Sequence, residues 1–270
     1  AKPNMNAREN IIVLVDEAHR TQEGDLGRQM RAALPYAFLF GLTGTPVNKA
    51  DKNTFWAFGA EEDQGGYMSR YTFHDSIRDD ATLPLHFEPR LVDVHVDKES
   101  IDKAMATFKE SAALSDEEAD ALNKKSAKMS AFLKSPERVA KIVKDISSHF
   151  KNKVAPHGFK AMIVTPDRFG CVQYKEELDN YFPQEASRVV ISISANDKLE
   201  FKQKWGIDKS KQEQIVDEFN DAQSDLKFII VTAKLLTGFD SPILQTMYLD
   251  KSLKDHTLLQ AICRTNRKYK

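Results

Sequence analysis

The sequence has few of the residues that form disulfides or cross membranes. Only two cysteines, Cys171 and Cys263, occur among 270 residues, and they lie far apart. This spacing argues against a disulfide framework and a cysteine-rich metal site, and it fits the reducing cytoplasm. No apolar run approaches membrane-spanning length and no signal peptide opens the chain, so we expect no membrane partner.

The chain also lacks a charge excess of either sign, because 39 basic residues nearly balance 40 acidic ones. A nucleic-acid partner would therefore be held by local patches and not by the overall charge. We interpret one lysine cluster as a solvated surface in preference to a DNA track: Lys198, Lys202, Lys204, Lys209 and Lys211.

A third absence concerns phosphate binding. The sequence nowhere contains the Gly-x-x-x-x-Gly-Lys-Ser/Thr loop whose backbone amides surround nucleotide phosphates. The chain begins shortly before an apolar run, and we interpret it as a fragment of a longer protein. With 41% apolar residues it can bury two modest cores, which favours two domains.

Hydrophobic patterns predict an α/β protein with two parallel-sheet domains. In residues 1–97, the apolar runs at 11–15 and 38–43 are typical of parallel strands buried on both faces. In residues 155–270, strands and helices alternate as in βαβ units. Residues 98–154 show helical periodicity, and we predict a helical insertion there.

Further elements are predicted at finer scale. An alternating run at 91–96 indicates a half-exposed strand, residues 65–80 give no clear pattern, and Ser135-Pro136 is typical of a helix start. A closing helix is expected over 256–264. Strands of the second domain are predicted at 161–165, 189–193, 228–232 and 246–250.

The first strand ends in the acidic motif Asp16-Glu17-Ala18-His19. Ligands of parallel sheets bind at the carboxyl ends of the strands. Asp16 is placed there to hold Mg²⁺, directly or through water, and Glu17 to orient and deprotonate an attacking water molecule. His19 could report the nucleotide state. Surface turns are also rich in acidic residues, but the apolar run before this motif favours the functional interpretation.

The second apolar run ends in Gly41-Leu42-Thr43-Gly44-Thr45-Pro46. Glycine allows a tight backbone path, and the hydroxyls of Thr43 and Thr45 can exchange hydrogen-bond partners. Alone, this would be an ordinary strand-ending turn. Because it follows the acidic motif, we interpret it as an element that couples nucleotide chemistry to movement.

The chain closes on Gln260-Ala261-Ile262-Cys263-Arg264-Thr265-Asn266-Arg267. In the closing helix, Gln260, Arg264 and Arg267 fall at i, i+4 and i+7, so we expect all three to project from one face. Two guanidinium groups on a shared face can bind the phosphate oxygens that are transferred, as an arginine finger does. The alternative is a solvated basic terminus.

Two segments of the second domain are candidates for nucleic-acid contacts. Thr232 and Lys234 follow a strand, Gly238 permits close backbone approach, and Asp240 can accept from a ribose hydroxyl or an arginine. Thr165 and Arg168 open a helix, where free amides favour a phosphate, although simple helix capping is the alternative.

Taken together, these motifs resemble superfamily 2 helicases and translocases, with 16–19, 41–46, 165–168, 232–240 and 260–267 in the places of motifs II to VI. The exact amino-acid strings narrow the resemblance to one family. Val-Asp-Glu-Ala-His-Arg-Thr-Gln, Gly-Leu-Thr-Gly-Thr-Pro, Lys-Leu-Leu-Thr-Gly-Phe-Asp-Ser-Pro and Gln-Ala-Ile-Cys-Arg-Thr-Asn-Arg are similar to strings of the R (motor) subunit of bacterial type I restriction-modification enzymes.

The resemblance implies two RecA-like lobes, the first truncated at its N-terminus, ATP and Mg²⁺ as cofactors, and double-stranded DNA as the track. It also implies methyltransferase (M) and specificity (S) subunits as partners in the cytoplasm, and a nuclease domain that cuts away from the recognition site. Asp16 would bind Mg²⁺, Glu17 would activate the attacking water molecule, and Arg264 and Arg267 would sense the nucleotide.

Because the chain has neither the phosphate loop nor the nuclease domain, we expect it alone neither to cut DNA nor to hydrolyse ATP appreciably. The alternatives are another superfamily 2 DNA helicase and an inactive DNA-binding scaffold.

Overall fold

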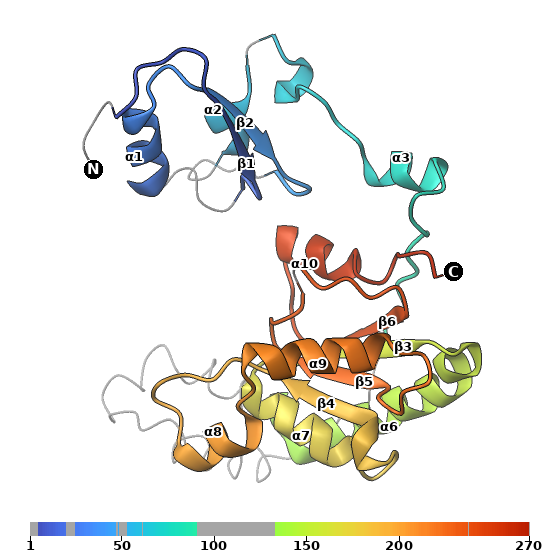
Figure 1. Cartoon of the computed structure of the whole chain (residues 1–270). Helices are drawn as coiled ribbons and strands as arrows, with labels where there is room; N and C mark the ends of the chain where they lie inside the picture. Colours follow the sequence, from blue (N-terminus) through green and yellow to red (C-terminus); the bar gives the residue numbers. More distant parts are fainter. Residues whose placement is uncertain are drawn as a thin grey trace, which may run out of the picture. The chain divides into compact units, whose positions relative to one another are not determined.

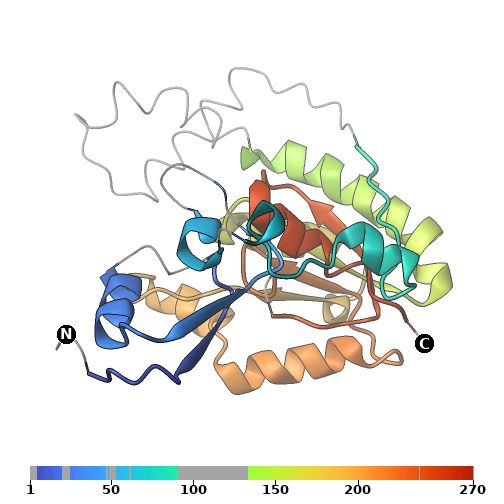
Figure 2. The ribbon, with the colours of Figure 1, turned by 90° about the horizontal axis from the view of Figure 1, so that it is seen from above.

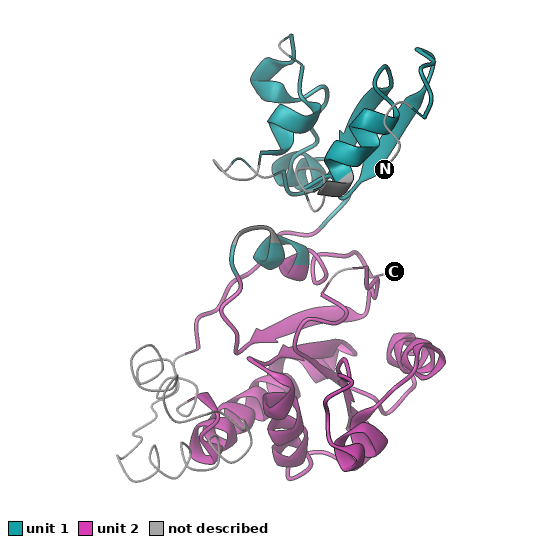
Figure 3. Cartoon of the chain, turned by 90° about the vertical axis from the view of Figure 1, so that its left-hand side faces the viewer, with its two compact units in different colours: residues 1–82, 254–260 teal, residues 83–253, 261–270 magenta. Residues whose placement is uncertain are grey.

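Residue contacts divide the chain into two units (Figure 3). Unit 1 comprises Ala1–Thr82 and Lys254–Gln260, and unit 2 comprises Leu83–Leu253 and Ala261–Lys270. The structure, a computed structural model, describes residues 5–19, 25–46, 48, 53–60, 62–90, 133–236 and 238–269. Within these ranges, no helix is both long enough and apolar enough to cross a lipid bilayer.

Unit 1 contains a two-stranded parallel sheet of β1 (Ile12–Asp16) and β2 (Phe38–Leu42), joined through α1 (Asp25–Ala33; Figure 1). The predicted strands are confirmed, but their burial on both faces is wrong. One face of the two-stranded sheet is exposed, because no second layer covers it among the described residues. The exposed fractions on this face are 66% for Ile12, 67% for Leu14, 62% for Phe38 and 54% for Leu42.

The rest of unit 1 consists of short helices that the sequence patterns did not indicate: α2 (Thr54–Phe58), η1 (Gln64–Gly66) and α3 (Phe73–Arg78). Local capping explains where two of them begin. The Asn53 side chain accepts from the amides of Phe55 and Trp56, and Thr72 and Asp75 form a reciprocal capping box. These helices are too short to show a helical period.

Unit 2 is built on a four-stranded sheet in which every neighbouring pair is parallel, in the order β4-β5-β3-β6. The prediction of parallel βαβ units is confirmed. Every residue of β3 and β5 is buried, as expected for central parallel strands. The strands are β3 (Lys160–Val164), β4 (Ser187–Val190), β5 (Phe228–Val231) and β6 (Leu244–Leu249).

Helices cover both faces of this sheet, which gives unit 2 three layers. One face packs against α6 (Pro136–His149) and α7 (Arg168–Leu178), and the other against α9 (Lys209–Asn220). Figure 2 shows α6 and α9 on opposite sides of the strands. The remaining elements of unit 2 are η2 (Phe150–Val154), η3 (Ala155–His157), η4 (Gln184–Ala186) and α8 (Leu199–Trp205). Helix α10 (Asp255–Ile262) belongs to unit 1 up to Gln260 and to unit 2 from Ala261.

Two segments differ from the sequence-based expectation. Helix α6 falls in the range predicted as an insertion, but Val139, Val143 and Ile146 bury its apolar stripe in the core of unit 2. Strand β4 ends at Val190, earlier than predicted, and residues 191–198 form a loop. The predicted strand at 91–96 and the helical pattern at 101–108 lie outside the described residues.

Candidate functional site

The acidic motif forms a fixed turn at the carboxyl end of β1. Glu17 has a positive φ of 48°, which is uncommon for a residue with a Cβ. The Glu17 amide donates to Oδ1 of Asp16 at 2.8 Å, and the Ala18 amide donates to the Leu42 carbonyl at 3.1 Å. This second bond ties the turn to the end of β2, so both acidic side chains are presented at one edge of the sheet.

His19 connects this turn to the threonine motif. Its side chain is buried, and Nδ1 lies 2.8 Å from Oγ1 of Thr43, 3.5 Å from Oγ1 of Thr45 and 3.3 Å from Oε2 of Glu17. The Thr45 amide also donates to Oγ1 of Thr43 at 3.1 Å. Four residues singled out from two separate motifs therefore form one polar cluster.

Close packing behind this cluster depends on a glycine. A Cβ at Gly41 would lie 2.7 Å from the Phe58 ring and 3.0 Å from Cβ of Ala18. A larger residue would separate β2 from α2 and displace the turn that carries Glu17. Gly41 thus serves the local packing beneath the site.

In unit 2, the residues that follow β3 are directed inward. Thr165 is fully buried, and its hydroxyl donates to the Asp167 carbonyl at 2.9 Å and lies 3.0 Å from Sγ of Cys171. The Asp167 side chain caps α7 by accepting from the Gly170 amide at 2.8 Å. In this structure the Thr165 side chain has no exposed surface for the DNA contact that the sequence predicted.

Arg168 is also committed within the protein. Its guanidinium forms a bidentate ion pair with Asp197 and donates to the Ser192 carbonyl at 3.0 Å. No sequence pattern indicated this partner, because Asp197 lies 29 positions from Arg168 and just before the lysine cluster that we interpreted as a solvated surface.

The segment after β5 is held from several sides. Lys251, which the motifs did not single out, donates to the Thr232 carbonyl at 3.1 Å. Arg264 donates to the carbonyls of Leu236 at 3.3 Å and Phe239 at 2.9 Å. Gly238 adopts a φ of 72°, which a residue with a side chain adopts rarely.

The C-terminal helix is shorter than the sequence predicted. Helix α10 ends at Ile262, so Gln260, Arg264 and Arg267 do not share one helical face. The chain leaves the helix because the amide and the hydroxyl of Thr265 both donate to the Ile262 carbonyl, at 3.0 and 2.9 Å. Turn bonds thus replace the next helical bond. Arg267 lies beyond this turn, with Nε 3.6 Å from Oδ1 of Asp240.

Two other potentially reactive side chains, Cys171 and Lys160, are buried in the core of unit 2. Burial raises the pKa of the Cys171 thiol to about 12, which keeps it protonated and unreactive at neutral pH. Burial also lowers the pKa of Lys160 to about 8, and its ammonium donates to the Asp221 carbonyl at 2.7 Å, just past the end of α9. Among the described residues, no cluster of three or more His, Cys, Asp or Glu side chains could hold a metal ion.

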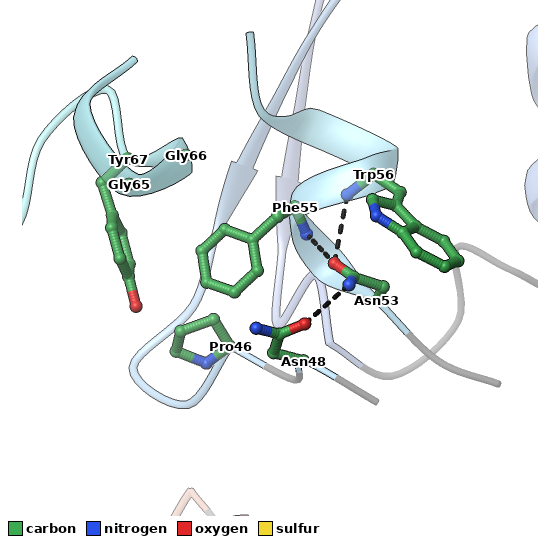
Figure 4. Close-up of a pocket in the computed structure, with 8 residues that line it drawn as sticks. All are labelled: Pro46, Asn48, Asn53, Phe55, Trp56, Gly65, Gly66 and Tyr67. Carbon is green, nitrogen blue, oxygen red and sulfur yellow. Dashed lines mark hydrogen bonds between the residues drawn. The ribbon is translucent and has the colours of Figure 1, made fainter. Parts of the chain in front are cut away.

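A pocket of about 490 Å³ lies in unit 1, next to the threonine motif (Figure 4). Its wall includes the rings of Pro46, Phe55 and Tyr67, and Asn53 donates to Asn48 at 2.8 Å. The Phe55 and Tyr67 rings meet edge to face, with centroids 5.0 Å apart. None of the predicted site residues lines this pocket.

Two protein-family profiles match the chain. Residues 1–120 match the SWI2/SNF2 ATPase profile, and residues 92–270, well over half of the chain, match that of type I restriction enzyme subunit R domain 3.

Curated relatives of this chain are endonuclease subunits of type I restriction enzymes. The chain is 37% identical, over 97% of its length, to the MjaVIIP subunit assigned to such an enzyme in Methanocaldococcus jannaschii. It is 35% identical, over 98% of its length, to the HindI subunit of Haemophilus influenzae. The chain spans only 27% and 26% of these relatives.

Solved structures share the fold. A fragment assigned to the HsdR subunit of a type I restriction enzyme from Vibrio vulnificus YJ016 matches 96% of this chain and 40% of that chain, with a TM-score of 0.56 and 14% identity. The Hef helicase domain of Pyrococcus furiosus matches 95% of this chain and 68% of that one, with a TM-score of 0.51 and 13% identity. At these identities the likeness establishes the α/β helicase-domain fold alone.

Proposed function

The chain belongs to the family of type I restriction enzyme R subunits, and from this we propose that it carries part of the ATP-driven motor that moves duplex DNA in such a subunit. The observation that carries the proposal is the His19 cluster. It joins Glu17, the proposed hydrolytic base, to Thr43 and Thr45 of the second motif. A motor requires such a link, because hydrolysis must change the hydrogen bonding of a neighbouring element.

We propose Mg²⁺ and ATP as the cofactors. Asp16 uses Oδ1 to fix the turn at Glu17, and its exposed carboxylate at the end of the strand is a hard oxygen ligand of the kind that Mg²⁺ prefers. Mg²⁺-ATP, when bound, supplies the phosphoanhydride bond that is hydrolysed. Glu17 would accept a proton from the water molecule that attacks this bond.

The two arginines support this proposal to different extents. The Arg267 side chain is 45% exposed and its only ion pair among the described residues is the 3.6 Å contact with Asp240, so it is available to a polyphosphate. Arg264 already donates to two backbone carbonyls. We propose nucleotide sensing for both, with Gln260, Gly238 and Asp240 also close to the nucleotide.

We further propose double-stranded DNA as the track, with Thr232 and Lys234 near its phosphates, and M and S subunits as partners in the cytoplasm. In the complete subunit, cleavage would belong to a nuclease domain outside these 270 residues. A strand-displacement assay beside a triplex-displacement assay tests this: translocation without unwinding supports the proposal, whereas strand separation would favour a DNA helicase of another kind.

The direct test is Glu17→Gln in the complete subunit. Loss of a general base reduces turnover by about 10²- to 10⁴-fold, while nucleotide binding persists because the glutamine side chain has the same shape. ATP hydrolysis is measured with and without linear duplex DNA, and binding with a fluorescent ATP analogue. Glu9→Gln, at an exposed position of unit 1, is the matched control. Unchanged turnover in Glu17→Gln would refute the assigned base.

A further inference from the structure

Residues 83–90, here called the strap, belong to unit 2, form neither helix nor strand and contain none of the sequence motifs. We propose that the strap is a positioning element for Arg267: Arg90 anchors it to α6, and Leu83 holds the backbone next to that arginine. The inference rests on the proposed role of Arg267 at the nucleotide, and it adds to that site two residues that no motif contains.

The first step is that no helix holds the backbone of Arg267. Helix α10 ends at Ile262, and Thr265 turns the chain away from the helical path. The Arg267 side chain is 45% exposed. A long side chain on an irregular segment presents its guanidinium in one geometry only when other contacts fix its backbone, and phosphate chemistry is sensitive to such positioning.

The second step is that two hydrogen bonds from other segments fix this backbone. The Leu83 amide donates to the Asn266 carbonyl at 2.8 Å, and Nε2 of Gln245, in β6, donates to the Arg267 carbonyl at 3.0 Å. These carbonyls belong to the two planar peptide groups on either side of the Arg267 Cα. The two bonds together therefore fix the direction in which the Arg267 side chain leaves the backbone.

The third step is the anchor at the other end of the strap. Arg90 donates to both carboxylate oxygens of Asp145 on α6, from Nε at 2.6 Å and from Nη2 at 2.7 Å, and it also pairs with Glu88. A bidentate pair of this kind has a defined geometry. Val143 and Ile146 of α6 are buried in the core of unit 2, so the strap is tied to a helix that is itself fixed on the sheet.

The fourth step is that little else holds the strap. Among the described residues, the Leu83 amide is the one strap amide with an acceptor, and the ion pairs of the strap involve Glu88 or Arg90. Positions 84 and 86–90 are exposed. A segment with so few buried contacts opens locally unless its ends are held. The Leu83 bond therefore depends on the anchor at Arg90.

The strap begins directly where unit 1 ends, because the division between the units falls between Thr82 and Leu83. In unit 1, the Thr82 amide donates to the Ser76 carbonyl at 3.3 Å, and its hydroxyl lies 2.8 Å from Oγ of Ser76. Two consecutive residues are thus bonded into different units, with no slack residue between them. A displacement of Thr82 would act first on the bond between Leu83 and Asn266, and through it on the direction of Arg267.

The test compares Leu83→Pro with Leu83→Ala in the complete subunit. Proline removes the amide that donates to Asn266, whereas alanine keeps it. Because Pro84 follows, position 83 is already biased towards extended backbone, which proline also adopts. Leu83→Pro should lower kcat for ATP hydrolysis by about two- to tenfold relative to Leu83→Ala, the factor that one hydrogen bond represents. KM for ATP should be equal in both, because the charge that an arginine finger stabilises develops in the transition state.

A second set of variants tests the anchor without proline. Asp145→Arg places a like charge opposite Arg90, and it should lower kcat to a similar extent and speed amide exchange at Leu83. Adding Arg90→Glu restores an ion pair of reversed polarity, so the double variant should recover both values. Glu137→Arg, the same change at an exposed position of α6, is the control and should alter neither. A double variant as slow as Asp145→Arg would overturn the anchor.

The outcomes separate this proposal from the proposed function. If the unchanged complete subunit does not hydrolyse ATP in the presence of duplex DNA, the motor function and the strap both fail. If it does, and Arg267→Gln lowers turnover while Leu83→Pro and Leu83→Ala have equal kcat values, only the strap is overturned. Circular dichroism establishes that each variant is folded.

Discussion

At the scale of single residues, the structure separates side chains that solvent can reach from those that hold the backbone. Asp16 and Glu17 are presented by a turn that is tied to the neighbouring strand. Thr165 and Arg168 carry polar groups in motif positions, yet their hydrogen bonds are made within unit 2. The same residue type can serve either purpose, and only its partners decide between them.

A residue-scale prediction concerns Thr43, whose hydroxyl contacts Nδ1 of His19 and the Thr45 amide. Thr43→Val keeps the shape and removes both hydrogen bonds. In the complete subunit, DNA stimulation of ATP hydrolysis should fall by up to about tenfold, since a net hydrogen bond contributes about 0.5–1.5 kcal/mol. Thr45→Val, with its longer 3.5 Å contact, should have a smaller effect. Equal stimulation in all three proteins would contradict the coupling role.

A second residue-scale prediction concerns pH. Burial, followed by the nearby charge of Arg90, lowers the pKa of His149 below 6.5, and Nδ1 lies 2.8 Å from the Tyr248 hydroxyl. The unfolded chain therefore takes up this proton at higher pH than the folded chain does. The stability that this group contributes is fully present above pH 6.5 and is lost as the pH falls towards the lowered folded pKa.

His149→Gln should consequently flatten the dependence of the urea midpoint on pH just below 6.5. His157→Gln, at an exposed position after η2, is the control and should leave the profile as it is. An unchanged profile in His149→Gln would show that another group is responsible.

At the scale of elements, the points where helices and strands begin and end determine which charged side chains meet. Helix α10 stops at Ile262, and this places Arg264 against the loop after β5. Helix α6 begins at Pro136, and Arg138 in its first turn reaches Asp250 at the end of β6. Tyr174 of α7 donates to the same carboxylate at 2.7 Å. Three elements of unit 2 therefore converge on one acidic side chain.

The prediction at this scale is Asp250→Ala. The Arg138 side chain is only 12% exposed and would lose its carboxylate, so the free energy of unfolding should fall by about 3–5 kcal/mol in urea titrations. Glu213→Ala breaks the ion pair with Lys209 within one turn of α9, where exposed pairs contribute about 0.3–0.5 kcal/mol. Equal losses in the two variants would contradict the structural role given to Asp250.

At the scale of the whole molecule, the two units differ in how completely they bury their apolar surface. Unit 2 has a hydrophobic cluster on each face of a four-stranded sheet. Unit 1 has two strands with one apolar face exposed, and isolated two-stranded sheets are marginally stable. The chain spans about a quarter of the relatives that it matches, and we propose that segments of a complete subunit cover this face.

We therefore expect residues 83–270 to fold alone with one cooperative urea transition, while residues 1–82 do not. In the whole chain, trypsin should remove residues 1–82 first, and the exposed face of β1 and β2 should bind the dye ANS. Replacing Ile12 and Leu14 by serine should reduce dye binding without moving the transition of unit 2. A single transition shared by both units would contradict this difference.

The sequence by itself determined the class of fold and the places of the motifs. In unit 2, apolar runs identify central parallel strands that are covered on both faces, whereas β1 and β2 have the same kind of run with one face exposed. We expect the acidic and hydroxyl residues that follow the strands to lie at the ligand edge. The acidic motif, the threonine motif and the six strands found among the described residues lie where these patterns predict them, within a few residues.

Only the tertiary structure decided which polar groups remain available. Hydrogen-bond partners far apart in sequence, such as Asp197 for Arg168 or Leu236 for Arg264, carry no local signal. The end of α10 depends on turn bonds to the Ile262 carbonyl, and the burial of α6 depends on the sheet it covers. Periodicity records which side of an element is apolar, but the partner of a charge is set by the packing of whole elements.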